Sequence, residues 1–131
     1  YPTPDGSCVR DYVHVDDLAL AHVAAAEALE GGTALEPVYN LGSGDGVSVL
    51  QIMDAVRRVT GIEFTPELRD RRAGDPARIV ATGELAARDL GWTMRHELDD
   101  MVASAWAACV TCACAACACW VSVAMVPSAA R

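Results

Sequence analysis

The strongest constraint on the fold is a change of hydrophobic period near the start of the chain. Residues 9–15 alternate apolar and polar side chains, which is the pattern of a short β-strand with one buried face. Residues 18–29 then follow helical spacing, with Asp16 as the expected N-cap, Asp17 as an acid favoured by the helix dipole, and the glycine pair 31–32 as the stop. A strand followed directly by a helix predicts an α/β fold.

The rest of the chain repeats this alternation of strands and helices. A strand is expected at 38–41, a loop at 42–46, and a second helix from a Ser48 cap to a Gly61 stop. The later expected elements are an extended segment at 62–68, a charged loop at 69–76, a strand at 78–81, a helix at 84–90 and a final helix that begins at 98–106. These helices are too few to cover both faces of a large sheet. The chain is therefore expected to be part of a larger α/β protein.

All ten basic residues are arginines, and the chain contains no lysine. The formal net charge is −8 at pH 7, which argues against nucleic acid and against an anionic membrane surface as partners. A small phosphorylated ligand remains compatible, because a few well-placed guanidinium groups suffice to bind a phosphate. Mechanisms that need a lysine, such as a Tyr-x-x-x-Lys acid/base pair, cannot be completed by this chain.

The C-terminal stretch differs in composition from the rest of the chain. No charged residue occurs between 101 and 130, and five of the six cysteines lie between Cys109 and Cys119. On a helix these cysteines would scatter around the axis, which disfavours a metal site, and the high alanine and cysteine content disfavours a membrane span. An abrupt change of this kind is typical of a frame change in a GC-rich coding sequence. Residues 107–131 are therefore set apart as an atypical Ala/Cys-rich tail, and no function is inferred from them.

Two other patterns suggest chemistry that their spacing does not support. The 42–46 loop has the form G-x-G-x-G after a strand, but its third glycine comes one residue too early for a dinucleotide fingerprint. A turn that leads to the Ser48 cap is expected there instead. His14 and His22 have no second metal ligand at a sensible spacing, so we expect both to be structural and predict no metal site.

Two motifs are specific enough to indicate a family. The first is VRDYVHVDDLA at 9–19, with Ala-His at 21–22, and the second is RRAGDP at 71–76. YNLG at 39–42 lies between them and LGW at 90–92 follows. In unbroken order from residue 1 to about residue 106, these motifs resemble the C-terminal third of the UDP-glucose 4-epimerases, a group within the extended short-chain dehydrogenase/reductase family.

The resemblance implies that residues 1–106 are the C-terminal, nucleotide-sugar-binding portion of such an enzyme, with the Rossmann cofactor domain absent. The implied activity is the interconversion of UDP-glucose and UDP-galactose through a 4-keto intermediate, with NAD bound by the absent N-terminal domain. The family uses a Tyr-x-x-x-Lys pair for the hydroxyl proton, so this lysine-free chain is expected to be inactive alone. A cytoplasmic location and a homodimeric parent enzyme are also implied. The alternatives are another nucleotide-sugar epimerase or dehydratase of the same family, or a non-catalytic remnant.

The resemblance also implies four substrate-binding residues. Arg10 and Arg72 are expected to contact the diphosphate of a UDP-sugar and Asp75 the ribose of its uridine, with Tyr12 close by. The chemistry is suitable, because guanidinium groups bind two phosphate oxygens at once and a carboxylate accepts hydrogen bonds from hydroxyls. No residue of this chain is expected to be catalytic, to bind the cofactor or to bind a metal.

Overall fold

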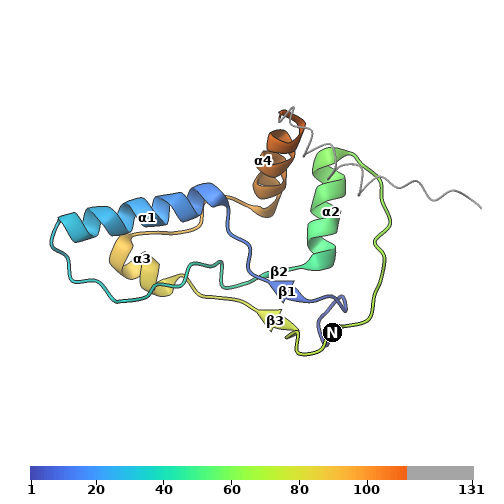
Figure 1. Ribbon diagram of the computed structural model, residues 1–131, viewed down its shortest axis with the longest axis horizontal. Coiled ribbons are helices and arrows are strands. Elements are labelled where there is room, and N and C mark those ends of the chain that lie inside the picture. The colour runs from blue at the N-terminus through green and yellow to red at the C-terminus, as the bar shows by residue number, and fades with distance from the viewer. Residues whose placement is uncertain (112–131) are drawn as a thin grey trace, which may run out of the picture.

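The computed structural model describes residues 1–111, in which four helices and a small sheet are joined by long irregular segments (Figure 1). The elements in chain order are β1 (Val9–Arg10), α1 (Val15–Glu30), β2 (Val47–Ser48), α2 (Val49–Thr60), β3 (Arg78–Ile79), α3 (Glu84–Leu90) and α4 (Leu98–Thr111). This order confirms the expected α/β class. No helix within these residues combines the length and the apolar character needed to cross a bilayer.

The last helix, α4, continues to Thr111, across the boundary predicted between residues 106 and 107. Cys109, the first cysteine of the cysteine-rich stretch, lies on this helix and is half-buried. The other cysteines of that stretch, and with them most of the interpretation of the tail, lie outside the described residues.

The sheet is small, and β1 is its central strand. The strand order is β2-β1-β3, with β1 antiparallel to β2 and parallel to β3. Val9 pairs with Ser48 on one side and with Arg78 on the other, and its side chain is buried. The sheet therefore joins the start of the chain to two segments that follow it at long range.

The strand predicted at 9–15 pairs over only two residues, and the one predicted at 38–41 is irregular. The first strand stops because the Asp11 carboxylate accepts hydrogen bonds from the Ser43 and Ala81 amides, both at 3.0 Å. A continuing ladder would need backbone partners in place of that side chain. The second expectation was wrong because residues 38–41 pair with no strand in the part of the chain that the structure describes.

Helix α1 begins earlier than predicted, at Val15, and its N-cap is His14 rather than Asp16. Nδ1 of the His14 ring accepts a hydrogen bond from the Asp16 amide at 3.0 Å, the role that a Ser or Asp side chain usually plays. Asp17 is an acidic residue of the first turn, as expected, and its side chain is fully buried. The predicted stop at the glycine pair 31–32 is confirmed.

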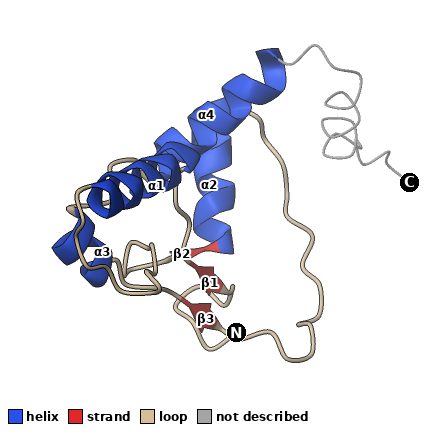
Figure 2. Cartoon of the chain, turned by 60° about the vertical axis from the view of Figure 1, so that its left-hand side comes forward, coloured by secondary structure: helices blue, strands red, loops and turns tan. Residues whose placement is uncertain are grey.

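Helix α2 begins and ends where its local signals predict. The Ser48 hydroxyl accepts from the Gln51 amide, and the Gln51 side chain accepts from the Ser48 amide, which makes a complete capping box. Gly61 ends the helix at φ 69°, in the left-handed region that favours glycine. Helix α4 packs against α2, and the two lie side by side in both views (Figures 1 and 2).

The hydrophobic core lies where α1 packs on α3, around the buried residues Ala21, Ala86 and Trp92. The half-buried side chains packed against them are Val13, Tyr39, Leu41, Leu90 and Met94. The core is small, and α1 keeps large apolar side chains exposed, among them Val15, Val23 and Leu29. The described residues therefore leave part of the apolar surface of α1 uncovered.

Candidate functional site

An arginine–aspartate pair joins the end of β1 to the loop before β3. Nη2 of Arg10 donates to Oδ1 of Asp75 at 2.5 Å, although the two residues lie 65 positions apart. The side chains are 23% and 28% exposed, respectively. The pair is thus ordered by the fold while both charged groups still reach solvent, which is the condition for binding a polar ligand.

Two further residues complete a cluster around the Asp75 carboxylate. The Tyr1 hydroxyl donates to Oδ2 of Asp75 at 2.5 Å. The guanidinium carbon of Arg71 lies 4.8 Å from the centroid of the Tyr1 ring, and its Nε donates to the Asp75 carbonyl at 3.1 Å. The hydrogen bond from Tyr1 and then the charges of Arg10 and Arg71 hold the pKa of Asp75 below its ordinary value. Asp75 is therefore an ionised acceptor at neutral pH.

The four predicted site residues are only partly brought together. Arg10 and Asp75 form the pair itself, and Arg72 lies in the same turn as Asp75, whose amide donates to the Arg72 carbonyl at 3.3 Å. The Arg72 side chain is exposed, and it makes no hydrogen bond or ion pair with the residues that the structure describes. Tyr12 is 36% exposed, and burial raises the pKa of its hydroxyl.

An open hollow lies beside Arg10. Its volume is about 470 Å³, and its lining residues are Arg10, Asp11, Asn40, Leu41, Ile79, Val80 and Ala81. These residues come from the ends of β1 and β3 and from the segment before the 42–46 loop. The hollow therefore lies where three segments that are distant in sequence meet.

Asp11 holds these segments together, a structural role that the sequence interpretation did not assign to it. Its carboxylate accepts from the Ser43 hydroxyl at 2.7 Å and from the Ser43 and Ala81 amides at 3.0 Å each. Burial is the largest single influence on its pKa and raises it, but these hydrogen bonds together lower the pKa. A signal was present, because Asp11 occupies a position where the strand alternation expects a buried apolar side chain.

Gly42 is required next to this carboxylate. A Cβ at this position would lie 2.3 Å from Oδ2 of Asp11 and 2.5 Å from the Ala81 carbonyl oxygen. The loop that follows is a turn, as predicted, because the Ser43 hydroxyl accepts from the Asp45 amide at 3.2 Å and from the Gly46 amide at 3.1 Å. The turn leads through β2 to the Ser48 cap.

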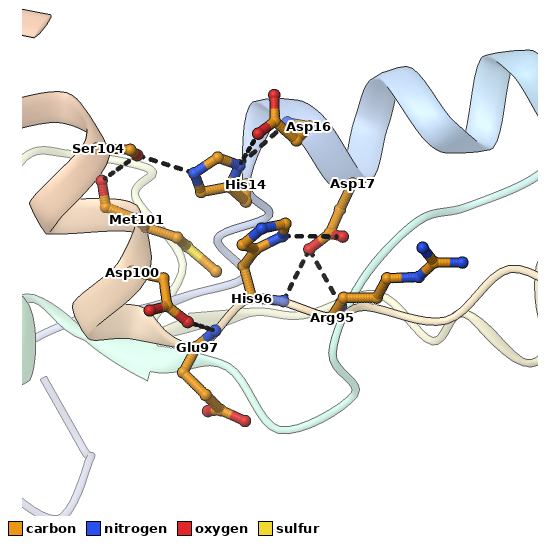
Figure 3. A network of polar contacts seen from close by, with 9 residues as sticks. All are labelled: His14, Asp16, Asp17, Arg95, His96, Glu97, Asp100, Met101 and Ser104. Carbon is orange, nitrogen blue, oxygen red and sulfur yellow. Dashed lines mark hydrogen bonds and ion pairs between the residues drawn. The ribbon is translucent and has the colours of Figure 1, made fainter.

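A second polar cluster joins the start of α1 to α4 and to the segment before it (Figure 3). The Asp17 carboxylate Oδ2 accepts from the Arg95 amide at 3.2 Å and the His96 amide at 3.1 Å. Nδ1 of His96 lies 3.1 Å from Oδ1 of Asp17. Nε2 of His14 lies 2.8 Å from the Ser104 hydroxyl of α4. These contacts connect residues about 80–90 positions apart.

The donor atoms of His14, Asp16 and His96 lie within 4.8 Å of one another, a spacing that a metal ion could bridge. The geometry does not suit one, because the two imidazole rings are stacked with centroids 4.2 Å apart and planes 21° apart. Their in-plane lone pairs therefore do not converge, and both His14 nitrogens already have protein partners. His14 has a structural role as the N-cap of α1.

Comparison with known proteins gives the same family throughout. A family model described as the NAD dependent epimerase/dehydratase family matches residues 2–42. The UDP-glucose 4-epimerase of Corynebacterium glutamicum is 51% identical over 108 residues, which cover 82% of this chain and 32% of that protein. A crystal structure of UDP-glucose 4-epimerase is 48% identical, with a TM-score of 0.76, over 81% of this chain and 32% of that chain.

A further solved structure contains bound ligands. The UDP-glucose 4-epimerase of Bifidobacterium longum, in complex with NAD+ and UDP, is 42% identical with a TM-score of 0.70, over 79% of this chain and 30% of that chain. The chain thus spans about a third of the length of the relatives it matches. It belongs to the NAD-dependent epimerase/dehydratase family, and within that family it is similar to the UDP-glucose 4-epimerases.

Proposed function

We propose that this chain is the C-terminal, nucleotide-sugar-binding portion of an NAD-dependent 4-epimerase that interconverts UDP-glucose and UDP-galactose. The family, the similarity to UDP-glucose 4-epimerases and the UDP bound in one of the similar structures all support this proposal. We extend it to a cytoplasmic location and a homodimeric parent enzyme, as the family resemblance implies. Within residues 1–106 the site is built from the Arg10–Asp75 pair, and residues 107–131 have no proposed role.

The observation that carries the proposal is the half-exposed Arg10–Asp75 pair, which the fold assembles from distant segments. A diphosphate needs fixed cationic donors, and Arg10 and the neighbouring exposed Arg72 supply guanidinium groups of the required geometry. The ribose of the same ligand presents hydroxyl groups, for which the ionised Asp75 is the acceptor. Tyr12, which follows Asp11 in the chain, is assigned to contact the same nucleotide.

The chain does not contain the residues for the hydride and proton steps. It has no lysine, so it cannot form a Tyr-x-x-x-Lys pair, and the 42–46 loop is a turn around Ser43 rather than a dinucleotide fingerprint. When NAD is bound to the whole enzyme, it accepts and returns the hydride of the sugar. We therefore assign NAD binding to a part of the enzyme outside this sequence, and expect the isolated chain to bind UDP without catalysing epimerisation.

The direct test is a titration of the isotope-labelled chain with UDP, followed by amide NMR shifts. Wild type should bind UDP with a dissociation constant on the order of millimolar or tighter. Arg10→Ala should weaken binding about 10-fold or more, because it removes a charge-assisted hydrogen bond. The matched control is Arg88→Ala, which breaks an exposed arginine–aspartate pair on α3 and should leave UDP binding unchanged.

The outcomes separate the possibilities clearly. Saturable shifts at Arg10 and Asp75 in wild type, lost in Arg10→Ala and kept in Arg88→Ala, would support the proposal. No saturable binding of UDP, or equal losses in the two variants, would overturn it. Uridine in place of UDP tests the role of the phosphates, and it should bind more weakly than UDP if Arg10 and Arg72 contact them.

A further inference from the structure

The carboxylate of Asp75 is held at both of its oxygens. Oδ1 accepts from Arg10 and Oδ2 accepts from Tyr1, each at 2.5 Å. An ionised carboxylate has about four lone-pair sites, so with respect to residues 1–111 each oxygen keeps one acceptor direction free. Since the side chain is 28% exposed, the free directions are open to a ligand. The two fixed donors therefore determine the orientation in which the carboxylate meets it.

Tyr1 is itself held in place. The guanidinium of Arg71 covers its ring at 4.8 Å from the centroid, and the Tyr1 carbonyl accepts from the Thr3 amide at 2.9 Å. Arg71 in turn is tied to the loop by its hydrogen bond to the Asp75 carbonyl at 3.1 Å. The hydrogen bond to Asp75 is the main cause that raises the pKa of the Tyr1 hydroxyl, so Tyr1 is a donor at neutral pH. The resemblance in sequence assigned no role to Tyr1.

We propose that Tyr1 is a positioning residue of the nucleotide site: its hydroxyl fixes the Asp75 carboxylate so that the free lone pairs accept the 2′- and 3′-hydroxyls of a ribose. A carboxylate that is already held at a fixed rotation loses less conformational freedom when two neighbouring hydroxyls donate to its two oxygens. Tyr1 thereby contributes to the selection of ribonucleoside diphosphates over their 2′-deoxy counterparts. This inference rests on the proposed function, and goes beyond it by naming a residue and a specificity.

The test compares UDP with 2′-deoxy-UDP on the whole chain. Wild type should bind UDP at least about 5-fold more tightly than 2′-deoxy-UDP, because the carboxylate–hydroxyl hydrogen bond is charge-assisted. Tyr1→Phe keeps the ring under Arg71 and removes only the hydroxyl, and it should reduce that preference to about 2-fold or less. The larger loss should fall on UDP, because 2′-deoxy-UDP has only the 3′-hydroxyl to donate to the Asp75 carboxylate.

The matched control is Tyr39→Phe. The Tyr39 hydroxyl also donates to an aspartate, Asp89, at 3.0 Å, but on the α3 side of the molecule. This variant should keep the preference for UDP, so the same chemical change at another tyrosine–aspartate pair controls for general destabilisation. A second check uses Asp75→Asn, in which Tyr1→Phe should cause no further loss of preference, because Tyr1 acts through the Asp75 carboxylate.

The possible failures are distinguishable. If wild type does not bind UDP, the proposed function itself fails. If wild type binds both nucleotides equally, Asp75 does not contact the 2′-hydroxyl, and the proposed role of Tyr1 in ribonucleotide selection is overturned while UDP binding stands. If Tyr1→Phe weakens both nucleotides by the same factor and keeps the preference, Tyr1 is merely structural and the inference is wrong.

Discussion

Replacing Asp17 with alanine should destabilise the fold more than any other single change at the start of α1. Asp17 is fully buried, and its carboxylate is the hydrogen-bond partner of the Arg95 and His96 amides. The alanine variant leaves two part-buried N–H groups without that acceptor, at about 1–2 kcal/mol each. It also removes the carboxylate that faces Nδ1 of His96 at 3.1 Å. We expect a total loss of about 4 kcal/mol, a large share of the roughly 5–15 kcal/mol that stabilises a typical domain.

The measurement is urea unfolding followed by circular dichroism, with hydrogen exchange of the two freed amides as a local readout. The amides of Arg95 and His96 should lose their protection in Asp17→Ala, even where the rest of the fold persists. The neighbouring Asp16 is the matched control, because its side chain is 69% exposed and its backbone N–H keeps its bond to His14. Asp16→Ala should cost less than about 1 kcal/mol. Equal effects of the two substitutions, or a loss below about 1 kcal/mol for Asp17→Ala, would refute this account of the buried carboxylate.

Three further changes test other parts of the structure. Ser48→Ala removes the cap of α2 and the hydroxyl that donates to Asp5, so thermal unfolding should report a loss of about 1–2 kcal/mol. Gly42→Ala places a methyl group 2.3 Å from Oδ2 of Asp11, so it should cost about 1–3 kcal/mol and alter the amide shifts around the hollow. The folded-state pKa values of Asp11 and Asp17 are lowered, so their contribution to stability should be complete above the unfolded value of about 4 and be lost as pH falls through the folded values. Urea midpoints measured from pH 7 to pH 3 should accordingly stay level and then drop, and Asp17→Asn should flatten the drop.

The parts of the fold that the sequence predicted correctly are those that local interactions decide. The Ser48 capping box joins residues three positions apart, and Gly61 ends α2 through its own backbone angle. Both signals act within one helical turn, so they can be recognised without knowing what packs against the helix. The helix at 84–90 was likewise predicted with its observed bounds, and Gly91 follows it in the left-handed conformation.

The errors share the opposite property. His14, which caps α1 in place of Asp16, also contacts Ser104, 90 positions later, through its Nε2. Asp17 turns inward to accept from amides almost 80 positions later. The predicted strand at 9–15 is cut short by the side chain of Asp11, which bonds to amides at distant positions. Spacing within one segment carries no information about such contacts. A polar residue at an apolar position of a strand was the one visible sign, and it marked a residue that holds the hollow together.

The candidate site shows the same division between local and distant information. The motifs identified Arg10 and Asp75 through resemblance, but no pattern indicated that the two side chains pair directly. Tyr1 had no signal at all, since a tyrosine in a turn-forming segment is ordinary. Tyr1 and Arg10 bond to the Asp75 carboxylate and Arg71 bonds to the Asp75 carbonyl, and this arrangement is a property of the folded chain alone.

The two polar clusters of this chain show how exposure separates a structural role from a binding role. Asp17 and Asp75 each accept two hydrogen bonds from protein groups and each have a lowered pKa, so neither property distinguishes them. Asp17 is fully buried between α1 and the segment before α4, and no ligand can reach it without unfolding that junction. Asp75 keeps 28% of its side chain exposed, with free acceptor directions beside two arginines. A carboxylate that the fold has oriented but not enclosed is suited to accept hydroxyl groups, and this difference leads us to place the nucleotide at Asp75.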